Sequence, residues 1–543
     1  MKILFSIISL IILYAQIVFA NIINIPDDYQ TIQAGIDAAS NGDTILVANG
    51  VYYESIDYDG RDVFLSSMYL YSSNRDDIDF TIIRTDFEDR VITFDSGESS
   101  DAVVNGFTIM QGKAIYGGGI ICENSNPIIT NCAFIDNYSE GFGGAIFCEN
   151  CSPIIRNNIF LDNYAEDNGG AIYCLRSDPD IYGNTFTENS TARNAGAIYC
   201  WYSNPEIEFN RMIQNSAGDR GGAIYLWGSN PRIIDNQIEL NDAQRYGGAM
   251  YIYASNPIIY GNIVSKNSSL ERGGGIFFWH SMPIIKNNIV CQNSSAIAGG
   301  IYCADNSDAE IINNSVISNL GVDMAGGFYC RDSGPQLINN IFWHNESPDG
   351  AEIYLTSSAN PIISYCNVEG GWEGIGNIDS DPLFRDTLSG DYHLMAIDCG
   401  DTHDSPGIDS GDPDLADDSL DCDYGLGTIR SDLGCYGGGM ITVGINDHER
   451  SGNALPLRTE LLNSYPNPFN ATTVLRFVNQ SAGDINLSIY DILGRKITTL
   501  YDGYAAEGEL QISWSAREQA TGVYFARLTT VSGTSSRRLI LLK

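Results

Sequence analysis

An asparagine returns every 26 residues through the middle of this chain. The column consists of Asn137, Asn163, Asn189, Asn215, Asn241, Asn267, Asn293, Asn319 and Asn345. A fixed period of this length is typical of repeat proteins, in which each unit buries its apolar face only against its neighbours. The repeats hold short runs of Ile, Val, Phe and Tyr between Gly, Asn and Pro, without a helical pattern. Each unit is therefore predicted to be one coil of β-strands.

Three apolar columns with the same period indicate the inside of the coils. Alternation along a strand places Ile146 and Cys148 on one face and Phe147 and Glu149 on the other. The Ile146 and Cys148 positions stay apolar in the other repeats, as do the columns that contain Ile129 and Phe134. The predicted fold is all-β: a three-sided right-handed parallel β-helix with about 26 residues per coil, followed by a small C-terminal antiparallel β-sandwich.

A second asparagine column indicates a tight turn. It consists of Asn158, Asn184, Asn210, Asn236, Asn262, Asn288, Asn314 and Asn340. Asparagine tolerates the left-handed backbone conformation, and stacked amides form hydrogen bonds along the axis of the coils. Both columns are interpreted as scaffold ladders without a chemical role.

The charge and the N-terminal segment point to an exported protein. Residues 1–20 contain Lys2, an apolar run and a Val-Phe-Ala cleavage pattern, so we predict a signal peptide removed before Asn21, with a membrane anchor as the alternative. No other stretch is long and apolar enough to cross a bilayer. A formal net charge of −39 excludes nucleic acid as a partner, because no basic face is present to neutralise phosphates.

The spacing of the thirteen cysteines does not indicate a disulfide framework. Four of them form an inward column, in which a free thiol behaves as a small apolar side chain. These are Cys122, Cys148, Cys174 and Cys200. Outside the repeats, Cys399, Cys422 and Cys435 are the candidates for one bridge.

The segments that flank the repeats are expected to be caps. Residues 25–39 have helical apolar spacing and are followed by a strand pattern at 44–47. This resembles the opening of pectin-lyase-fold proteins, in which a short amphipathic helix plugs the first coil. We assign a cap with irregular coils to 21–116, regular repeats to 117–368, a closing segment to 369–445 and a linker to 446–463.

Three motifs after residue 463 carry a second resemblance. Residues 465–470 read YPNPFN, residues 487–497 read LSIYDILGRKI, and residues 522–528 read GVYFARL. In this order they resemble the type A sorting domain of type IX secretion cargo, which we assign to 464–543. The resemblance implies a β-sandwich, contact with the type IX secretion machinery, and release outside the cell or attachment to its surface.

The repeats also resemble those of polymorphic outer-membrane adhesins. That family carries a Gly-Gly-Ala-Ile element and a Phe-x-x-Asn element per coil, found here at 143–146 and 160–163. The chain departs from the family because no outer-membrane barrel follows the repeats. An adhesive role is therefore an expectation by analogy.

Stacked carboxylates are the candidates for a metal site. Asp136, Asp162 and Glu188 share one column, and Glu123 and Glu149 share another. Such columns suit Ca²⁺ or an acid/base pair, and the alternative is that they are solubility charges. No Gly-His-Gly setting, Ser-His-Asp order or zinc spacing is present among the five histidines.

Aromatic residues on the outward side of one strand are the main candidate ligand site. Eight rings on four successive coils are predicted to face solvent, with an arginine before each Gly-Gly turn. The rings are Tyr199, Trp201, Tyr225, Trp227, Tyr251, Tyr253, Phe277 and Trp279, and the arginines are Arg193, Arg220, Arg245 and Arg272. Exposed rings mark a contact surface, and guanidinium groups bind carboxylated sugars in two-point fashion.

Three functions follow from these features. The first is an exported or surface-attached adhesin or glycan-binding protein whose site spans residues 199–279. The second is a polysaccharide lyase or hydrolase for uronic-acid polymers, with Arg220 or Arg245 as base or charge stabiliser and calcium on the carboxylates. The third is a passive surface rod.

Overall fold

The computed structural model describes most of the chain. Described are residues 21–438 except 388, 418–419, 421 and 423–424, together with 460–461, 472–479, 483–491, 495–505, 508–517, 519, 522–530 and 533–541. The chain divides into two compact units, Met1–Thr442 and Val443–Lys543. The predicted signal peptide, most of the predicted linker and the 465–470 motif lie outside the described residues.

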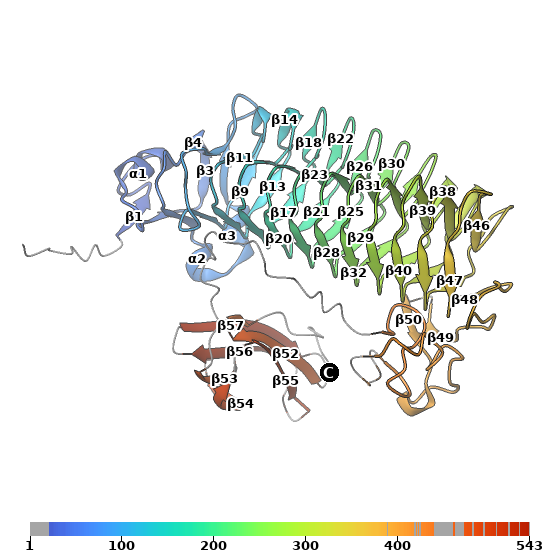
Figure 1. Ribbon diagram of the computed structural model, residues 1–543. Helices are drawn as coiled ribbons and strands as arrows, with labels where there is room; N and C mark the ends of the chain where they lie inside the picture. The colour runs from blue at the N-terminus through green and yellow to red at the C-terminus, as the bar shows by residue number, and fades with distance from the viewer. Residues whose placement is uncertain are drawn as a thin grey trace, which may run out of the picture. The chain divides into compact units, whose positions relative to one another are not determined.

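Each regular coil contributes one strand to each of four parallel sheets (Figure 1). A representative coil consists of β19 (Ile172–Leu175), β20 (Asp180–Tyr182), β21 (Thr185–Thr187) and β22 (Ser190–Thr191). Its next coil begins with β23 (Ile198–Trp201), whose Ile198 pairs with Ile172. The 26-residue period of the sequence is therefore the in-register pairing of one coil with the next.

Three of the sheets run the length of the helical unit. Sheet 1 has 14 strands, from β1 (Ile22–Ile25) to β47 (Ile362–Ser364), and includes β20. Sheet 2 has 13 strands, from β3 (Gly50–Tyr53) to β48 (Asn367–Val368), and includes β21. Sheet 3 has 12 strands, from β4 (Ile56–Asp57) to β46 (Ile353–Leu355), and includes β19.

The three predicted inward columns form one continuous core. Ile146, Ile129 and Phe134 are all fully buried and belong to the same apolar cluster as their equivalents in the other coils. The cysteines of the inward column are buried and unbridged. Packing of this kind buries each coil against two neighbours, which is how a repeat too small to fold alone becomes stable.

A fourth sheet was not predicted. Sheet 4 has nine short strands, from β10 (Lys113–Tyr116) to β42 (Leu320–Met324), and includes β22. The turns that follow these strands fold against the outer side of sheet 3 and enclose a second apolar cluster, which contains Phe147, Tyr173 and Ala195. The coils are therefore not simply three-sided, and the outer side of sheet 3 is largely covered.

Both asparagine columns are hydrogen-bonded ladders in the interior. The backbone N–H and the Nδ2 of Asn215 both donate to Oδ1 of Asn241, each at 2.9 Å. The second ladder repeats this geometry between Asn210 and Asn236, at 2.8 and 3.0 Å. In the second column the left-handed residue is not the asparagine, as the sequence suggested, but the residue before it, such as Phe209 with φ of 54° before Asn210.

The N-terminal segment contains a short helix within the range 25–39 in which helical spacing was predicted, but the helix covers only part of that range. Helix α1 (Ile32–Ala38) begins after Thr31, whose side chain accepts the N–H of Ala34 at 3.2 Å. Its buried Ile32 and Ile36 join the main core, so the helix plugs the first coil. Strand β2 (Thr44–Val47) follows, and two short helices, α2 (Tyr69–Ser72) and α3 (Arg75–Asp79), project from an early coil (Figure 1).

The closing segment lies along the side of the helix. Its hairpin, β49 (Phe384–Asp386) and β50 (Asp391–Leu394), contributes Tyr392 to a cluster with residues of sheet 2 such as Ile317. Asn313 donates to the backbone oxygen of Asp432 at 2.8 Å. A disulfide joins Cys399 to Cys422, which confirms one of the pairings open to the three candidate cysteines, and Cys435 is buried and free.

The C-terminal unit consists of two antiparallel sheets around its own core. One sheet contains β51 (Glu460–Leu461), β52 (Thr472–Asn479) and β55 (Gly508–Ser515). The other contains β53 (Gly483–Asp491), β54 (Lys496–Ala505), β56 (Gly522–Thr530) and β57 (Gly533–Leu541). Leu475 and Trp514 of the first sheet pack with Leu487 and Leu528 of the second, which confirms the predicted sandwich.

Candidate functional site

Half of the predicted aromatic surface is buried. Tyr199, Tyr225, Tyr251 and Phe277 are at most 3% exposed, although they point away from the main core as predicted. Their rings stack in register, with centroids 4.7 Å apart between Tyr199 and Tyr225. The prediction that these four rings face solvent is wrong, because the turns after sheet 4 cover them.

The other predicted rings form a partly exposed column. They lie at the last residue of four strands of sheet 3: β23, β27 (Ile224–Trp227), β31 (Met250–Tyr253) and β35 (Ile276–Trp279). Ring centroids of Trp201 and Trp227 are 5.7 Å apart, and those of Tyr253 are 5.6 Å from both Trp227 and Trp279. Trp227 is 38% exposed, and Tyr202, which stacks beside Trp201, is 58% exposed.

We call Trp201, Tyr202, Trp227, Tyr253 and Trp279 the aromatic strip. It follows the axis of the helix across four coils, because all its members except Tyr202 occupy equivalent places in successive repeats. The indole nitrogens of Trp201 and Trp279 are buried without a hydrogen-bond partner, so these two side chains present ring surface and not a donor. Tyr202 was not among the predicted residues, since it follows the strand and breaks the alternation that identified the others.

The four predicted arginines fall into two neighbouring columns. Arg193 and Arg245 alternate with acids along the coils: Arg193 lies 3.1 Å from Asp167, and Arg245 lies 3.5 Å from Asp219 and 3.2 Å from Glu271. Arg220 and Arg272 lie over aromatic rings, as Arg245 also does at 4.7 Å from the centroid of Tyr246, and Arg220 in addition lies 3.5 Å from Asp219. Arg220 is 5.4 Å from the centroid of Tyr251, and Arg272 is 5.8 Å from that of Tyr302.

These contacts weaken the predicted role of the arginines. A guanidinium group that already pairs with a carboxylate has less capacity to clamp the carboxylate of a sugar. A base would need a lowered pKa, but the hydrogen bond to Glu271 raises the pKa of Arg245. Burial lowers the pKa of Arg220, yet the neighbouring Tyr251 and Asp219 more than offset it, and the net shift is upward.

The predicted calcium ligands do not converge. Asp136, Asp162 and Glu188 occupy the left-handed position before each ladder asparagine, with φ of 54°, 54° and 56°. Glu123 and Glu149 pair in register on sheet 3. Among the described residues, no group of three or more His, Cys, Asp or Glu side chains is arranged to hold a metal ion.

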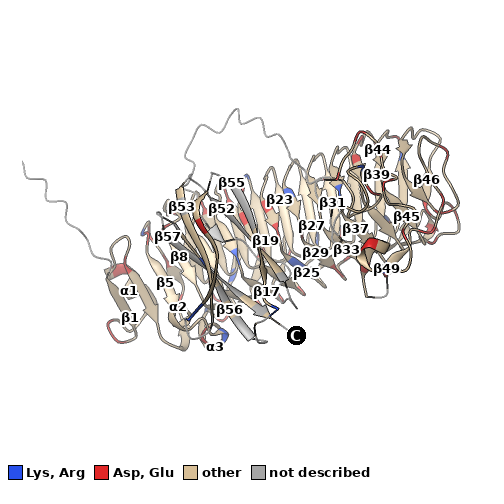
Figure 2. Cartoon of the chain, turned by 90° about the horizontal axis from the view of Figure 1, so that it is seen from below, with Lys and Arg blue, Asp and Glu red and all other residues tan. Residues whose placement is uncertain are grey.

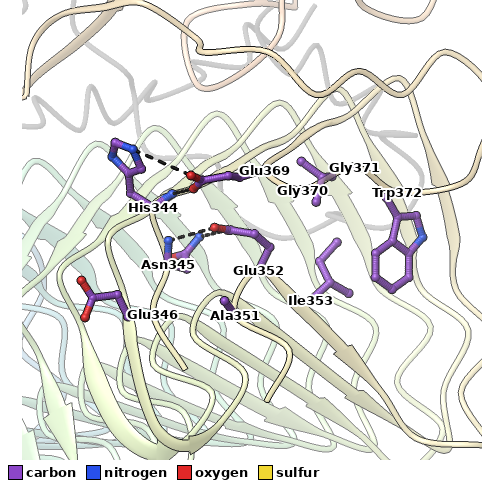
Figure 3. A pocket seen from close by; sticks show the side chains of 11 residues that line it. His344, Asn345, Glu346, Ala351, Glu352, Ile353, Glu369, Gly370, Gly371 and Trp372 are labelled. Atoms are coloured by element: carbon purple, nitrogen blue, oxygen red, sulfur yellow. Dashed lines mark hydrogen bonds and ion pairs between the residues drawn. The ribbon is translucent and has the colours of Figure 1, made fainter. Parts of the chain in front are cut away.

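A cavity of about 540 Å³ lies at the C-terminal end of the coils (Figure 3). We call it the end pocket. It is lined by His344, Asn345, Glu346, Ala351, Glu352, Ile353, Val368, Glu369, Gly370, Gly371 and Trp372. None of these residues was predicted as a site residue, apart from the ladder residue Asn345.

The end pocket exists because the first asparagine ladder stops. The next ladder position after Asn345 is 371, which is glycine. Glu352 takes over the role of the missing amide: its carboxyl group accepts the N–H of Asn345 at 3.0 Å and also accepts the Nδ2 of that residue. Gly370 and Gly371, with φ of 82° and 81°, place no side chain in the space thus left.

Two carboxyl groups meet in the end pocket (Figure 3). Burial is the main cause that raises the pKa of Glu352 to about 8, and the nearby charge of Glu369 adds to it. Burial thus favours the uncharged form of Glu352. Glu369 accepts the backbone N–H of His344 at 2.7 Å, and its other oxygen lies 4.0 Å from Nε2 of that histidine.

Basic residues are sparse over the described part of the molecule. In Figure 2, Lys and Arg positions occur singly among those of Asp and Glu, without a basic stripe in this view. Across the described residues, no helix has the combination of length and apolar character that crossing a membrane requires.

Family models match both units of the chain. A model described as the right-handed β-helix region matches residues 43–212, 203–327 and 274–390. A model described as the secretion system C-terminal sorting domain matches residues 463–542. The second match confirms the predicted sorting domain, which directs the protein to the cell surface or out of the cell.

Comparisons with individual known proteins do not identify a function for this chain. No curated protein matches this chain. Among solved structures, the complex of XylC with xylose aligns with 91% of this chain and 100% of its own, at 11% sequence identity and a TM-score of 0.29. That similarity is too low to support an argument about the site.

Proposed function

Because the chain belongs to the right-handed β-helix family and carries a secretion sorting domain, we propose that it is an exported glycan-binding adhesin. Its binding surface is the aromatic strip. The observation that carries this proposal is a row of partly exposed rings about as far apart as the coils, continued by the 58% exposed ring of Tyr202.

The strip suits a linear polysaccharide that lies along the helix axis. Aromatic faces offer apolar area at low conformational cost, and exposed rings gathered in one place mark a contact surface. The ligand is neutral rather than anionic, for two reasons. The nearby arginines already pair with acids or rings, and a chain with net charge −39 repels polyanions.

The alternative enzymatic function has less support. A lyase for uronic-acid polymers needs a base beside the substrate, and the raised pKa of both candidate guanidinium groups argues against either of them as that base. No metal-binding group of acids is present among the described residues. The passive rod remains as the outcome to be expected if no glycan binds.

Changing Trp227 and Tyr202 together to alanine is expected to weaken binding at least ten-fold, roughly the loss of 1.4 kcal/mol or more of stacking. Affinity electrophoresis of the full chain in cellulose-, xylan-, glucan- or polygalacturonate-derived gels measures the change. The melting temperature should stay nearly constant, because both rings are more than a third exposed.

Phe209→Ala is the matched control, since Phe209 is 41% exposed but lies outside the strip. It should bind like the parent. Parent protein that no neutral polysaccharide retards would contradict the proposal, and so would an equal loss in the control. New unsaturated ends on polygalacturonate would establish the lyase instead.

Deletion of residues 464–543 is expected to leave the protein in the periplasm. The β-helix has its own core, separate from that of the sorting domain, so it should still fold. Immunoblots of periplasm, cell surface and medium measure the distribution, with the full chain as control. Truncated protein at normal levels outside the cell would show that these residues are not needed for export.

A further inference from the structure

The end pocket differs from the aromatic strip in both shape and charge. It is a cavity of about 540 Å³, a volume that holds one or two sugar rings, whereas the strip is an open surface. It lies at the last coil, beyond Trp279 by more than two repeats. A ligand on the strip and a ligand in the pocket therefore occupy different parts of the molecule.

The end pocket is negatively charged and has one aromatic wall. Glu346 and Glu369 line it, and Glu352 is only 7% exposed beneath them. No Lys or Arg is among its eleven lining residues. Trp372 lies on the side away from His344 and packs partly against the main core, which holds the indole in place (Figure 3).

These features complement a compact cation attached to a ring. A carboxylate and an indole face together attract a protonated amine, through charge-assisted hydrogen bonds and through the ring quadrupole. A divalent metal is a poorer match, since no group of three or more ligating acids or histidines is arranged around a common point in the described structure. An anion is disfavoured, because nothing basic lines the cavity except His344.

We infer that the end pocket binds the protonated amine of an amino sugar, with the amine at Glu369 and the sugar ring against Trp372. The inference rests on the proposed glycan-binding function and adds a second subsite with its own specificity. The two left-handed glycines line this subsite without contributing a side chain to it.

Calorimetric titration of the full chain at pH 6 with three hexasaccharides tests the inference. The probes are a glucosamine hexamer, its N-acetylated form and cellohexaose. The glucosamine hexamer is expected to bind at least ten-fold more tightly than the acetylated form, which has no charge. Added salt should reduce that preference, because it screens the attraction between amine and carboxylate.

Glu369→Gln should abolish the preference for the free amine. The glutamine amide oxygen can still accept the N–H of His344, so the turn should be preserved. Glu310→Gln is the matched control: Glu310 is an exposed acid on sheet 1, away from the pocket, and its loss should leave the preference intact. Trp372→Ala should weaken both glucosamine oligomers.

The outcomes separate the subsite from the proposed function. Equal affinity for the free and acetylated hexamers, or a preference that survives Glu369→Gln, would overturn the inference. A trilysine peptide that binds as tightly as the glucosamine hexamer would overturn the assignment to a sugar. Cellohexaose that fails to bind would count against the aromatic strip alone, since the amine preference is measured independently of it.

Discussion

Asn215→Ala is expected to destabilise the β-helix by about 2–5 kcal/mol, far more than an ordinary polar substitution. Oδ1 of Asn215 accepts both the N–H and the Nδ2 of Asn189, at 3.1 and 3.0 Å. Its own Nδ2 donates to Asn241 and to the backbone oxygen of Phe186. All of these groups are fully buried, so no water replaces the lost partner.

Urea unfolding followed by circular dichroism measures this change. The control is Asn204→Ala, in a third, exposed series in which Oδ1 of Asn204 accepts the N–H of Asn230 at 2.8 Å. Water can satisfy that N–H, and the expected cost is below about 1 kcal/mol. Equal midpoints for the two variants would show that burial of the ladder does not determine its contribution.

The period of the sequence predicts the coil interior well. A 26-residue repeat, which most columns keep, indicates which residues pair between coils, and alternation then separates the two faces of each strand. Ile129, Ile146 and Phe134 are buried for this reason. The ladders were recognisable for the same reason, because an interior position that holds an amide in every coil repeats it eight or nine times.

Alternation does not reveal what covers the opposite face. Tyr199 and its equivalents were assigned to solvent, but sheet 4 folds over them. The strands of that sheet, such as β22, are often two residues long, which is too short to show a period of two. A weak signal was present in the small residues Ala217 and Ala243, which recur at the ladder spacing and are buried.

The 26-residue period, applied to each arginine separately, predicts the two arginine columns that the structure shows. Arg193 plus 26 is Asp219, and Arg220 plus 26 is Tyr246. The first column is thus a series of alternating charges, and the second contains rings. The prediction treated the four arginines as one set, although Arg220 and Arg272 lie one residue later in the repeat than Arg193 and Arg245.

The end pocket was missed for another reason. Its location follows from an interruption, the glycine at 371, and that interruption was visible. Its chemistry depends on Glu352, which directly precedes a strand of sheet 3 and so takes the place that Gly327 has in the previous coil. A glutamate in a column otherwise filled by glycine or alanine was a second visible signal, but neither departure from the repeat shows by itself that a cavity forms there.

Ile207→Asp is expected to have the largest effect on stability, more than about 4–5 kcal/mol. Ile207 is fully buried in sheet 1 and pairs in register with Ile181 and Ile233. The substitution removes the free energy that is gained by burying the isoleucine side chain. It also places an unpaired carboxyl group among apolar side chains. Because each coil is stabilised by the two beside it, the damage should extend to neighbouring coils.

Two controls isolate the cause of this loss. Ile207→Val keeps an apolar side chain and should lose only about 0.5–1.5 kcal/mol. Glu206→Gln changes the adjacent residue, which faces outward and lies 3.0 Å from Arg232; an exposed ion pair of this kind contributes at most about 1 kcal/mol. The midpoint of urea unfolding should therefore fall steeply for the aspartate alone. An aspartate variant that unfolds at the same urea concentration as the parent would place Ile207 at the surface and reverse the inside and outside of sheet 1.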